Sequence, residues 1–249
     1  MSYEQPTPLY ADANRSNAFE PVKSPIYEKD FDYEHLITED DEPVDNIFSE
    51  KQQRILTESL YSSWSGPGDA RSFLTLANVG LYYDPGKQPL VPDVLVSLDV
   101  LMPDDVWQKK NRSYFVKRYG KAPEVVIEIV SNKKGHETDT KLKDYAQAGV
   151  RYYVIFDPKE QLSQGQLCVY ELQNNCYVKK DDLWLSEVQL ALTLWEGQYE
   201  DKYDVWLRWC DQQGNLIATG KEKAEQALKH AKRLAAKLRE LGIDPETLD

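Results

Sequence analysis

The chain has 249 residues, of which 41% are hydrophobic and 29% charged, and its formal net charge is −12. This composition is typical of a globular protein with a substantial core. No apolar run reaches the roughly eighteen residues of a membrane-spanning helix, and the first residues do not resemble a secretory signal. Three widely spaced cysteines, Cys168, Cys176 and Cys210, form no Cys-x-x-Cys pair, which favours reduced thiols in the cytoplasm over a disulfide frame.

The negative charge is concentrated at the amino terminus. Residues 1–50 hold thirteen acids and three bases, whereas the remaining residues hold 29 acids and 27 bases. Residues 1–45 are rich in Pro, Asp and Glu and have little periodicity, which predicts an extended acidic arm. We divide the rest into a domain at 46–200 and a carboxyl-terminal extension at 201–249.

The central region predicts a mixed α/β fold. A helix is expected to begin at Ser49, with Gln52 completing a capping box. Beyond a long, mostly irregular segment at 104–121, a helix at 137–148 should end at Gly149. Strands are predicted at 73–83, 92–101, 124–130 and 151–156, followed by a hairpin at 166–177 and further strand-like sequence at 183–194. The order strand, helix, strand across 124–156 predicts a βαβ unit in a central mixed sheet flanked by helices.

The last predicted element is a helix over 221–241 with a heptad-like apolar pattern. Its apolar positions are Ala224, Ala227, Ala231, Leu234, Leu238 and Leu241. The pattern fits either a helix that packs on its own domain or a coiled coil between subunits, which the three alanines would weaken.

The first candidate site residue, Asp93, stands where the second predicted strand begins. Side chains alternate between the two faces of a strand. Val94, Val96, Leu98 and Val100 therefore share an apolar face, and Asp93, Leu95, Ser97 and Asp99 share the other.

The next predicted strand carries a second carboxylate, Glu128. Alternation places Glu128 opposite the apolar face of Val125, Ile127 and Ile129. An unpaired carboxylate buried there would cost several kcal/mol, so it needs a cation or a hydrogen-bond donor. Asp93 and Glu128 on neighbouring strands are thus candidate ligands of one Mg²⁺ (or Mn²⁺) ion, which would polarise a phosphate and acidify a bound water.

A lysine on the following helix completes the candidate site. Lys141 shares a helical stripe with Glu137, Tyr145 and Ala148, whereas Lys143 lies on a polar stripe. Lys141 is therefore the better candidate to meet a phosphate or an attacking water.

The spacing of these residues carries a family resemblance. Pro92-Asp93, Glu128-Ile-Val-Ser131, Lys141-x-x-x-Tyr145-x-x-x-Gly149-Val150 and Tyr153-Val-Ile-Phe-Asp157-Pro158 together resemble the Uma-two (Uma2) restriction endonuclease family, of the type abundant in cyanobacteria. The resemblance spans roughly residues 46–200, and Gly242-Ile-Asp-Pro245 is similar to the family's frequent tail. It implies a restriction-endonuclease-like fold of the PD-(D/E)XK superfamily and matches Asp93, Glu128 and Lys141 to the family's catalytic positions. It also implies DNA as the substrate and a homodimer that cuts both strands.

The sequence departs from the general motif in three places. Val130 stands where PD-(D/E)XK enzymes have lysine, and the resemblance implies that this role has moved to Lys141. Glu137 replaces the aspartate that the family often has, and no histidine occurs in the first helix.

Simpler roles remain open for each residue. Asp93 could serve as a strand-start turn residue, Glu128 could pair with Arg151 or a lysine, and Glu137 could be a helix-start acid. His136, Lys133 and Lys134 are more typical of a solvated loop than of a site, and Tyr152 and Tyr153 of a sheet than of a base-stacking surface.

The sequence therefore predicts a metal-dependent DNA endonuclease. A non-catalytic DNA-binding or protein-interaction module that kept the scaffold is the alternative. In a third hypothesis the acidic arm mimics DNA and covers the site.

Overall fold

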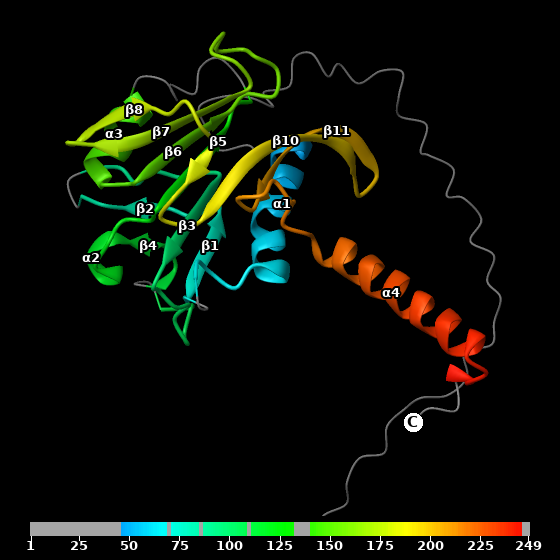
Figure 1. Ribbon diagram of the computed structural model, residues 1–249. Coiled ribbons are helices and arrows are strands. Elements are labelled where there is room, and N and C mark those ends of the chain that lie inside the picture. Colours follow the sequence, from blue (N-terminus) through cyan, green and yellow to red (C-terminus); the bar gives the residue numbers. More distant parts are fainter. Residues whose placement is uncertain (1–45, 69–70, 85–86, 109–110, 132–139, 246–249) are drawn as a thin grey trace, which may run out of the picture. The chain divides into compact units, whose positions relative to one another are not determined.

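The computed structural model of the chain describes residues 46–68, 71–84, 87–108, 111–131 and 140–245 (Figure 1). The chain divides into a unit at 1–37 and a unit at 38–249, and the described residues all belong to the second. The predicted acidic arm lies outside them. Among the described residues no helix is long and apolar enough to cross a membrane. Cys168, Cys176 and Cys210 are all free thiols, as predicted.

The first helix, α1 (Ile47–Ser63), begins earlier than predicted. Asn46 is its N-cap and accepts a hydrogen bond from the Ser49 backbone N–H at 2.9 Å. The prediction of Ser49 as N-cap, with Gln52 in a capping box, was therefore wrong. Asn46 is an equally good capping residue, and it leaves Gln52 inside the helix, where the side chain is buried.

A six-stranded mixed sheet forms the centre of the domain, as predicted, in the order β1-β3-β5-β6-β7-β8. β5 and β6 are parallel and joined through helix α3 (Thr140–Ala148), whereas every other neighbouring pair is antiparallel. Gly149 ends α3 at φ 81°, and the Val150 N–H bonds the Tyr145 carbonyl at 3.1 Å. The strands are β1 (Phe73–Ala77), β3 (Val94–Leu98), β5 (Val125–Ile129), β6 (Tyr152–Phe156), β7 (Leu167–Gln173) and β8 (Cys176–Lys179).

The central strands β3, β5 and β6 are buried on both faces. On one face, Val94, Val96, Val125 and Ile127 pack with Leu56 and other apolar residues of α1. On the other face, Leu95 and Val126 pack with Tyr145 and Ala148 of α3. Figure 1 shows α1 and α3 on opposite sides of the sheet. The predicted alternation is thus confirmed for these strands, whose β-branched sequence suits burial on two sides.

One residue of the predicted apolar face lies elsewhere. Val100 packs in the α3-side cluster and not with Val94, Val96 and Leu98. Asp99 has φ 58°, a left-handed conformation that ends β3 and breaks the alternation before Val100.

The segment at 73–83 forms two strands instead of one. Asn78 has φ 54° and separates β1 from β2 (Leu81–Tyr82). β2 pairs in parallel with β4 (Tyr114–Phe115), which leads into the short helix α2 (Val116–Tyr119). Leu81 and Tyr114 are buried in the same cluster as Tyr145, so this layer lies on the α3 side of the sheet.

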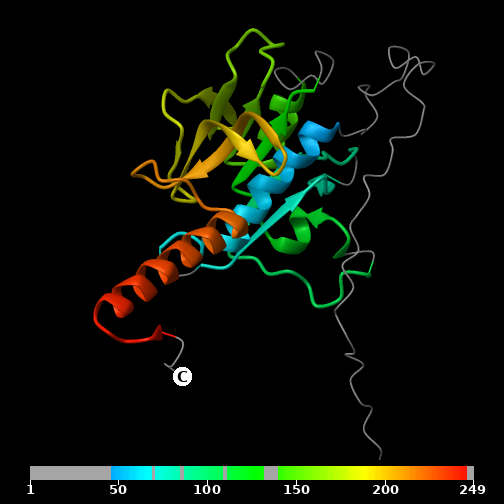
Figure 2. The same cartoon turned by 90° about the vertical axis from the view of Figure 1, so that its right-hand side faces the viewer.

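A second sheet covers α1 from its other side. It contains β9 (Trp184–Leu185), β10 (Leu190–Tyr199) and β11 (Lys202–Cys210), in the order β11-β10-β9. Leu207 and Trp209 of β11 belong to the core cluster of α1, and the Trp209 indole donates to the Leu56 carbonyl at 3.0 Å. Figure 2 shows α1 beside the gold β10 and β11. Core packing thus continues past residue 200.

Helix α4 (Gly220–Glu240) matches the predicted span within one residue. Thr219 and Glu222 form a capping box, and Glu222 also pairs with the buried Arg208 at 2.8 Å. No residue within the helix is buried, and Leu228 and Leu234 are about half exposed. Among its heptad positions Leu238 is half-buried and the others are exposed, so the stripe is not part of the described core.

The buried amide of Gln52 ties α1 to β11, which yields a stability prediction. Its Nε2 donates to the Leu207 carbonyl and its Oε1 accepts from the Leu207 N–H, both at 2.9 Å. Gln52→Ala leaves two buried backbone groups without these partners and should lower the free energy of unfolding by about 2 kcal/mol or more. Urea denaturation measures this loss. Gln226→Ala, on the exposed surface of α4, is the matched control, and an equal loss in both variants would contradict the prediction.

Candidate functional site

Asp93 and Glu128 lie on adjacent antiparallel strands. The β3–β5 register pairs Val94 with Ile127, and its continuation by one residue sets Asp93 opposite Glu128. Residues directly opposite in an antiparallel pair project to the same face. Because Val94 and Ile127 face α1, Glu128 emerges on the α3 side, where Lys141 and Tyr145 contact it. Asp93 precedes β3 and contacts Gln53 of α1.

Two donors fix the orientation of the Asp93 carboxylate. The Ile129 backbone N–H donates to Oδ2 at 2.6 Å, and the Gln53 side chain donates to Oδ1 at 2.7 Å. Burial, followed by the nearby negative charge of Glu128, raises the pKa of Asp93 to about 7. Asp93 is therefore neither a solvated turn residue nor a fully compensated charge.

Glu128 is 2% exposed and receives one donor on each oxygen. The Lys141 ammonium lies 2.9 Å from Oε2, and the Tyr145 hydroxyl donates to Oε1 at 2.5 Å. Burial and the charge of Glu128 raise the pKa of Tyr145 well above its ordinary value, so the hydroxyl keeps its proton. Lys141 and Tyr145 stand four residues apart on α3, so one helical face supplies both donors.

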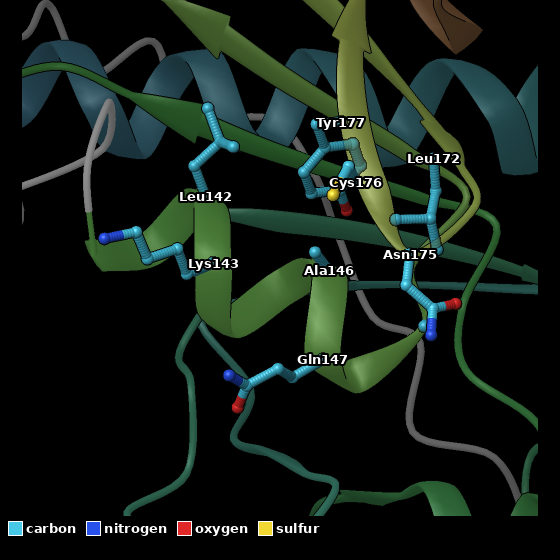
Figure 3. Close-up of a pocket in the computed structure, with 9 residues that line it drawn as sticks. Leu142, Lys143, Ala146, Gln147, Leu172, Asn175, Cys176 and Tyr177 are labelled. Atoms are coloured by element: carbon cyan, nitrogen blue, oxygen red, sulfur yellow. The ribbon is translucent and has the colours of Figure 1, made fainter.

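The lysine of the site thus comes from the helix. Position 130 is occupied by Val130, which is buried in the α3-side cluster. Lys143 is exposed and lines a cavity of about 560 Å³ between α3 and β8, which Figure 3 shows and which none of Asp93, Glu128 and Lys141 lines.

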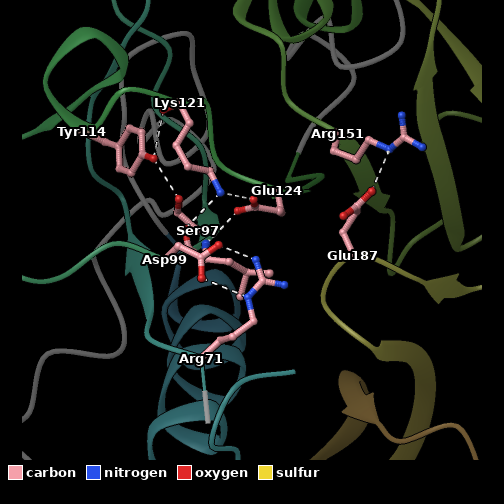
Figure 4. A network of polar contacts seen from close by, with 9 residues as sticks. Arg71, Ser97, Asp99, Tyr114, Lys121, Glu124, Arg151 and Glu187 are labelled. Carbon is pink, nitrogen blue, oxygen red and sulfur yellow. Dashed lines mark hydrogen bonds and ion pairs between the residues drawn. The ribbon is translucent and has the colours of Figure 1, made fainter. Parts of the chain in front are cut away.

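The other carboxylates of these strand faces have separate partners (Figure 4). Glu124 pairs with Lys121 and accepts the Leu98 backbone N–H at 2.7 Å, and Asp99 pairs with Arg71. Arg151, considered as a partner of Glu128, binds Glu171 instead at 2.8 Å. Tyr152 and Tyr153 are fully buried residues of β6.

Two members of the site were not assigned a role from sequence. Tyr145 was visible only as part of the Lys141 stripe. Gln53 had a weaker signal, a polar residue beside the apolar face of α1. The candidates Lys133, Lys134, His136 and Glu137 lie outside the described residues.

The donor set is compatible with a divalent cation. Asp93 and Glu128 are carboxylates, the oxygen donors that Mg²⁺ and Mn²⁺ prefer, and each oxygen keeps a lone pair beyond the hydrogen bond described. Burial and then the charge of Glu128 raise the pKa of Asp93, and a cation between the two carboxylates would relieve the repulsion between them. Within the described ranges no group of three or more His, Cys, Asp or Glu side chains gathers, so any cation here would need water or substrate oxygens as well.

Most of the chain matches one protein family. A family model, Uma2, described as "putative restriction endonuclease", matches residues 34–197. The chain belongs to the Uma2 family. The Uma2 match runs from before α1 into β10 and includes Asp93, Glu128 and Lys141, whereas β11 and α4 lie beyond it. No curated protein matches the chain.

The raised pKa of Asp93 gives this Uma2 member a testable pH dependence. An acid whose pKa is higher in the folded than in the unfolded state binds more protons when folded, so its contribution to stability is lost as pH rises through the folded value. Because the folded value is about 7 and the ordinary value 3.8, Asp93 should lower the free energy of unfolding between about pH 4 and pH 7. Denaturation at several pH values in EDTA measures this decline. Asp93→Asn should show a shallower decline over that window, and parallel curves for the two proteins would rule the assignment out.

Proposed function

We propose that the chain is a Mg²⁺- or Mn²⁺-dependent DNA endonuclease of the PD-(D/E)XK type that hydrolyses phosphodiester bonds. One observation carries the proposal: Glu128 is a buried carboxylate placed opposite Asp93 and paired with Lys141 at 2.9 Å. A carboxyl group whose pKa is raised by burial and by a neighbouring carboxylate, as that of Asp93 is, is typical of functional sites. Membership of the Uma2 family supports the same reaction class.

Each side chain has a distinct role in this proposal. Asp93 and Glu128 would hold the cation, which polarises the phosphate and acidifies a water when bound. Gln53 and the Ile129 N–H orient Asp93, and Tyr145 fixes Glu128, so the carboxylates are positioned before substrate arrives. The Lys141 ammonium would donate to a phosphate oxygen and offset the charge that grows as water adds to phosphorus and the bond to one sugar oxygen breaks.

A non-catalytic module is the alternative, and one observation favours it. Lys141 and Tyr145 already satisfy both oxygens of Glu128, which a purely structural ion pair would also achieve. Calorimetric titration with Mg²⁺ or Mn²⁺ separates the two functions, because only the enzyme needs divalent-ion binding that Asp93→Ala abolishes.

Assembly and location form part of the same proposal. Cutting both strands of a duplex requires two sites, so we propose a homodimer acting on DNA in the cytoplasm, without a membrane partner. The exposed Leu234 and Leu241, seven residues apart on the heptad stripe, leave apolar side chains for association of subunits. Light scattering of the full chain measures the oligomeric state.

Cleavage of plasmid DNA tests the catalytic role of the three residues. In Mg²⁺ or Mn²⁺ the protein should nick supercoiled plasmid, and Asp93→Ala, Glu128→Gln and Lys141→Ala should each lower the rate by about a hundredfold or more. Lys143→Ala changes a lysine of the same helix that is exposed, and should cut at the unaltered rate. Absence of cleavage on duplex and single-stranded DNA, together with no divalent-ion binding, would refute the enzyme function.

Deletion of residues 1–45 tests the acidic arm. If the arm competes with DNA, the truncated protein should bind DNA more tightly, and the difference should shrink as salt screens the charges. Fluorescence anisotropy with labelled DNA in EDTA measures both effects. Unchanged affinity at low salt would remove the arm from any inhibitory role.

A further inference from the structure

A second feature relevant to DNA is the segment 106–123. It contains six bases and no acid, in a chain whose formal net charge is −12. Trp107, Tyr114, Phe115 and Tyr119 are interspersed among these bases. Interleaved bases and aromatics are typical of surfaces that bind the phosphates and bases of nucleic acids.

Trp107 is presented to solvent by an ordered set of local hydrogen bonds. Its side chain is 79% exposed, a rare state for such a large apolar group. The Trp107 backbone N–H donates to the Asp105 carboxylate at 2.9 Å, and the Arg112 Nε donates to the Trp107 backbone carbonyl at 2.9 Å. The indole therefore projects from a defined turn and is not part of the core.

Three described bases of the segment are available for a ligand. Arg112, Lys117 and Arg118 are exposed, and none of them forms an ion pair with another described residue. Lys121, by contrast, is held by Glu124 and the Leu98 carbonyl. The three exposed bases thus give a local positive surface whose charge is not neutralised within the described structure.

This surface continues towards the candidate site. A groove of about 280 Å³ lies between the segment that carries Trp107 and Arg112 and the edge strand β1. Its lining includes Trp107, Arg112, Leu74 and Val79. Val79 follows Asn78, whose backbone N–H bonds the Asp93 carbonyl at 3.2 Å. Tyr114 and Tyr119 pack in the same cluster as Tyr145, on the face of the sheet where Glu128 and Lys141 meet.

We propose that Trp107, Arg112, Lys117 and Arg118 form a DNA-binding surface that holds the substrate strand beside the Asp93–Glu128 site. The three bases contact backbone phosphates, and the Trp107 indole stacks on an unpaired base. DNA is the ligand proposed because Arg112, Lys117 and Arg118 are exposed and form no ion pair with another described residue, whereas the nearby Asp105 carboxylate accepts hydrogen bonds from the Trp107 and Gln108 N–H groups. The exposed Trp107 ring also offers a flat face on which a base can stack. The inference rests on the proposed nuclease function and names how that site would engage its substrate.

Binding measured without cleavage tests the surface separately from catalysis. The full chain is titrated in EDTA against labelled single-stranded and duplex DNA by fluorescence anisotropy at several salt concentrations. The combined variant Arg112→Ala, Lys117→Ala, Arg118→Ala should bind both DNAs about tenfold or more weakly, and the slope of log affinity against log salt should fall by about two or three. The matched control removes three exposed bases of α4, Lys229→Ala, Lys232→Ala and Arg233→Ala, and should retain more affinity than the first variant.

Substitution of Trp107 tests whether its indole stacks on a base. Trp107→Ala should weaken binding of single-stranded DNA by about fivefold or more, whereas Trp107→Phe, which keeps an aromatic face, should restore part of it. Equal loss in the two triple variants, or unchanged affinity in Trp107→Ala and the first triple variant, would overturn the surface. If the wild-type chain bound a protein ligand more tightly than DNA through these same residues, the proposal of a DNA-binding surface would also be overturned. DNA binding through this surface without any cleavage in Mg²⁺ would uphold the surface while refuting the nuclease.

Discussion

The burial of one carboxylate, Glu128, is the constraint around which the domain is arranged. β5 is the third of six strands and all five of its residues are buried, so a charge on it has no access to bulk water. A charge in such a place costs several kcal/mol unless donors surround it. Lys141 and Tyr145 meet this need from a single face of α3. The βαβ crossover from β5 to β6 therefore joins the sheet and also returns the chain over its own carboxylate.

Asp93 adds a second carboxylate beside Glu128, and the described hydrogen-bond donors to Asp93 carry no charge. Its donors are a backbone N–H and an amide, both neutral, and its pKa rises to about 7. A fold selected only for stability has little reason to set two carboxylates opposite each other. Functional sites commonly retain such unfavourable contacts, so this arrangement supports the ligand-binding role proposed for the pair.

The sequence predicted the parts of the site that depend on local periodicity. Alternation along β5 placed Glu128 on the face opposite Val125 and Ile127, and helical spacing selected Lys141 over Lys143. What it missed depends on contacts distant in sequence or on a single backbone angle. Gln53 meets Asp93 across 40 residues, and the positive φ of Asp99 moved Val100 to the other face. Asn46 and Ser49 are nearly equivalent as N-caps, so propensity alone did not separate them. The catalytic assignment itself stays a prediction.

Gln52 and Gln53 are consecutive residues of α1 that bind in two directions. Gln52 holds the backbone of β11, and Gln53 holds the carboxylate of Asp93. The helix is therefore a rigid connector between the second sheet and the candidate metal ligand. The family match ends at residue 197, before β11 begins at Lys202. A fragment cut at the family boundary would lose β11, which packs against α1, so the residues that match the family and the residues that position Asp93 end at different points of the chain.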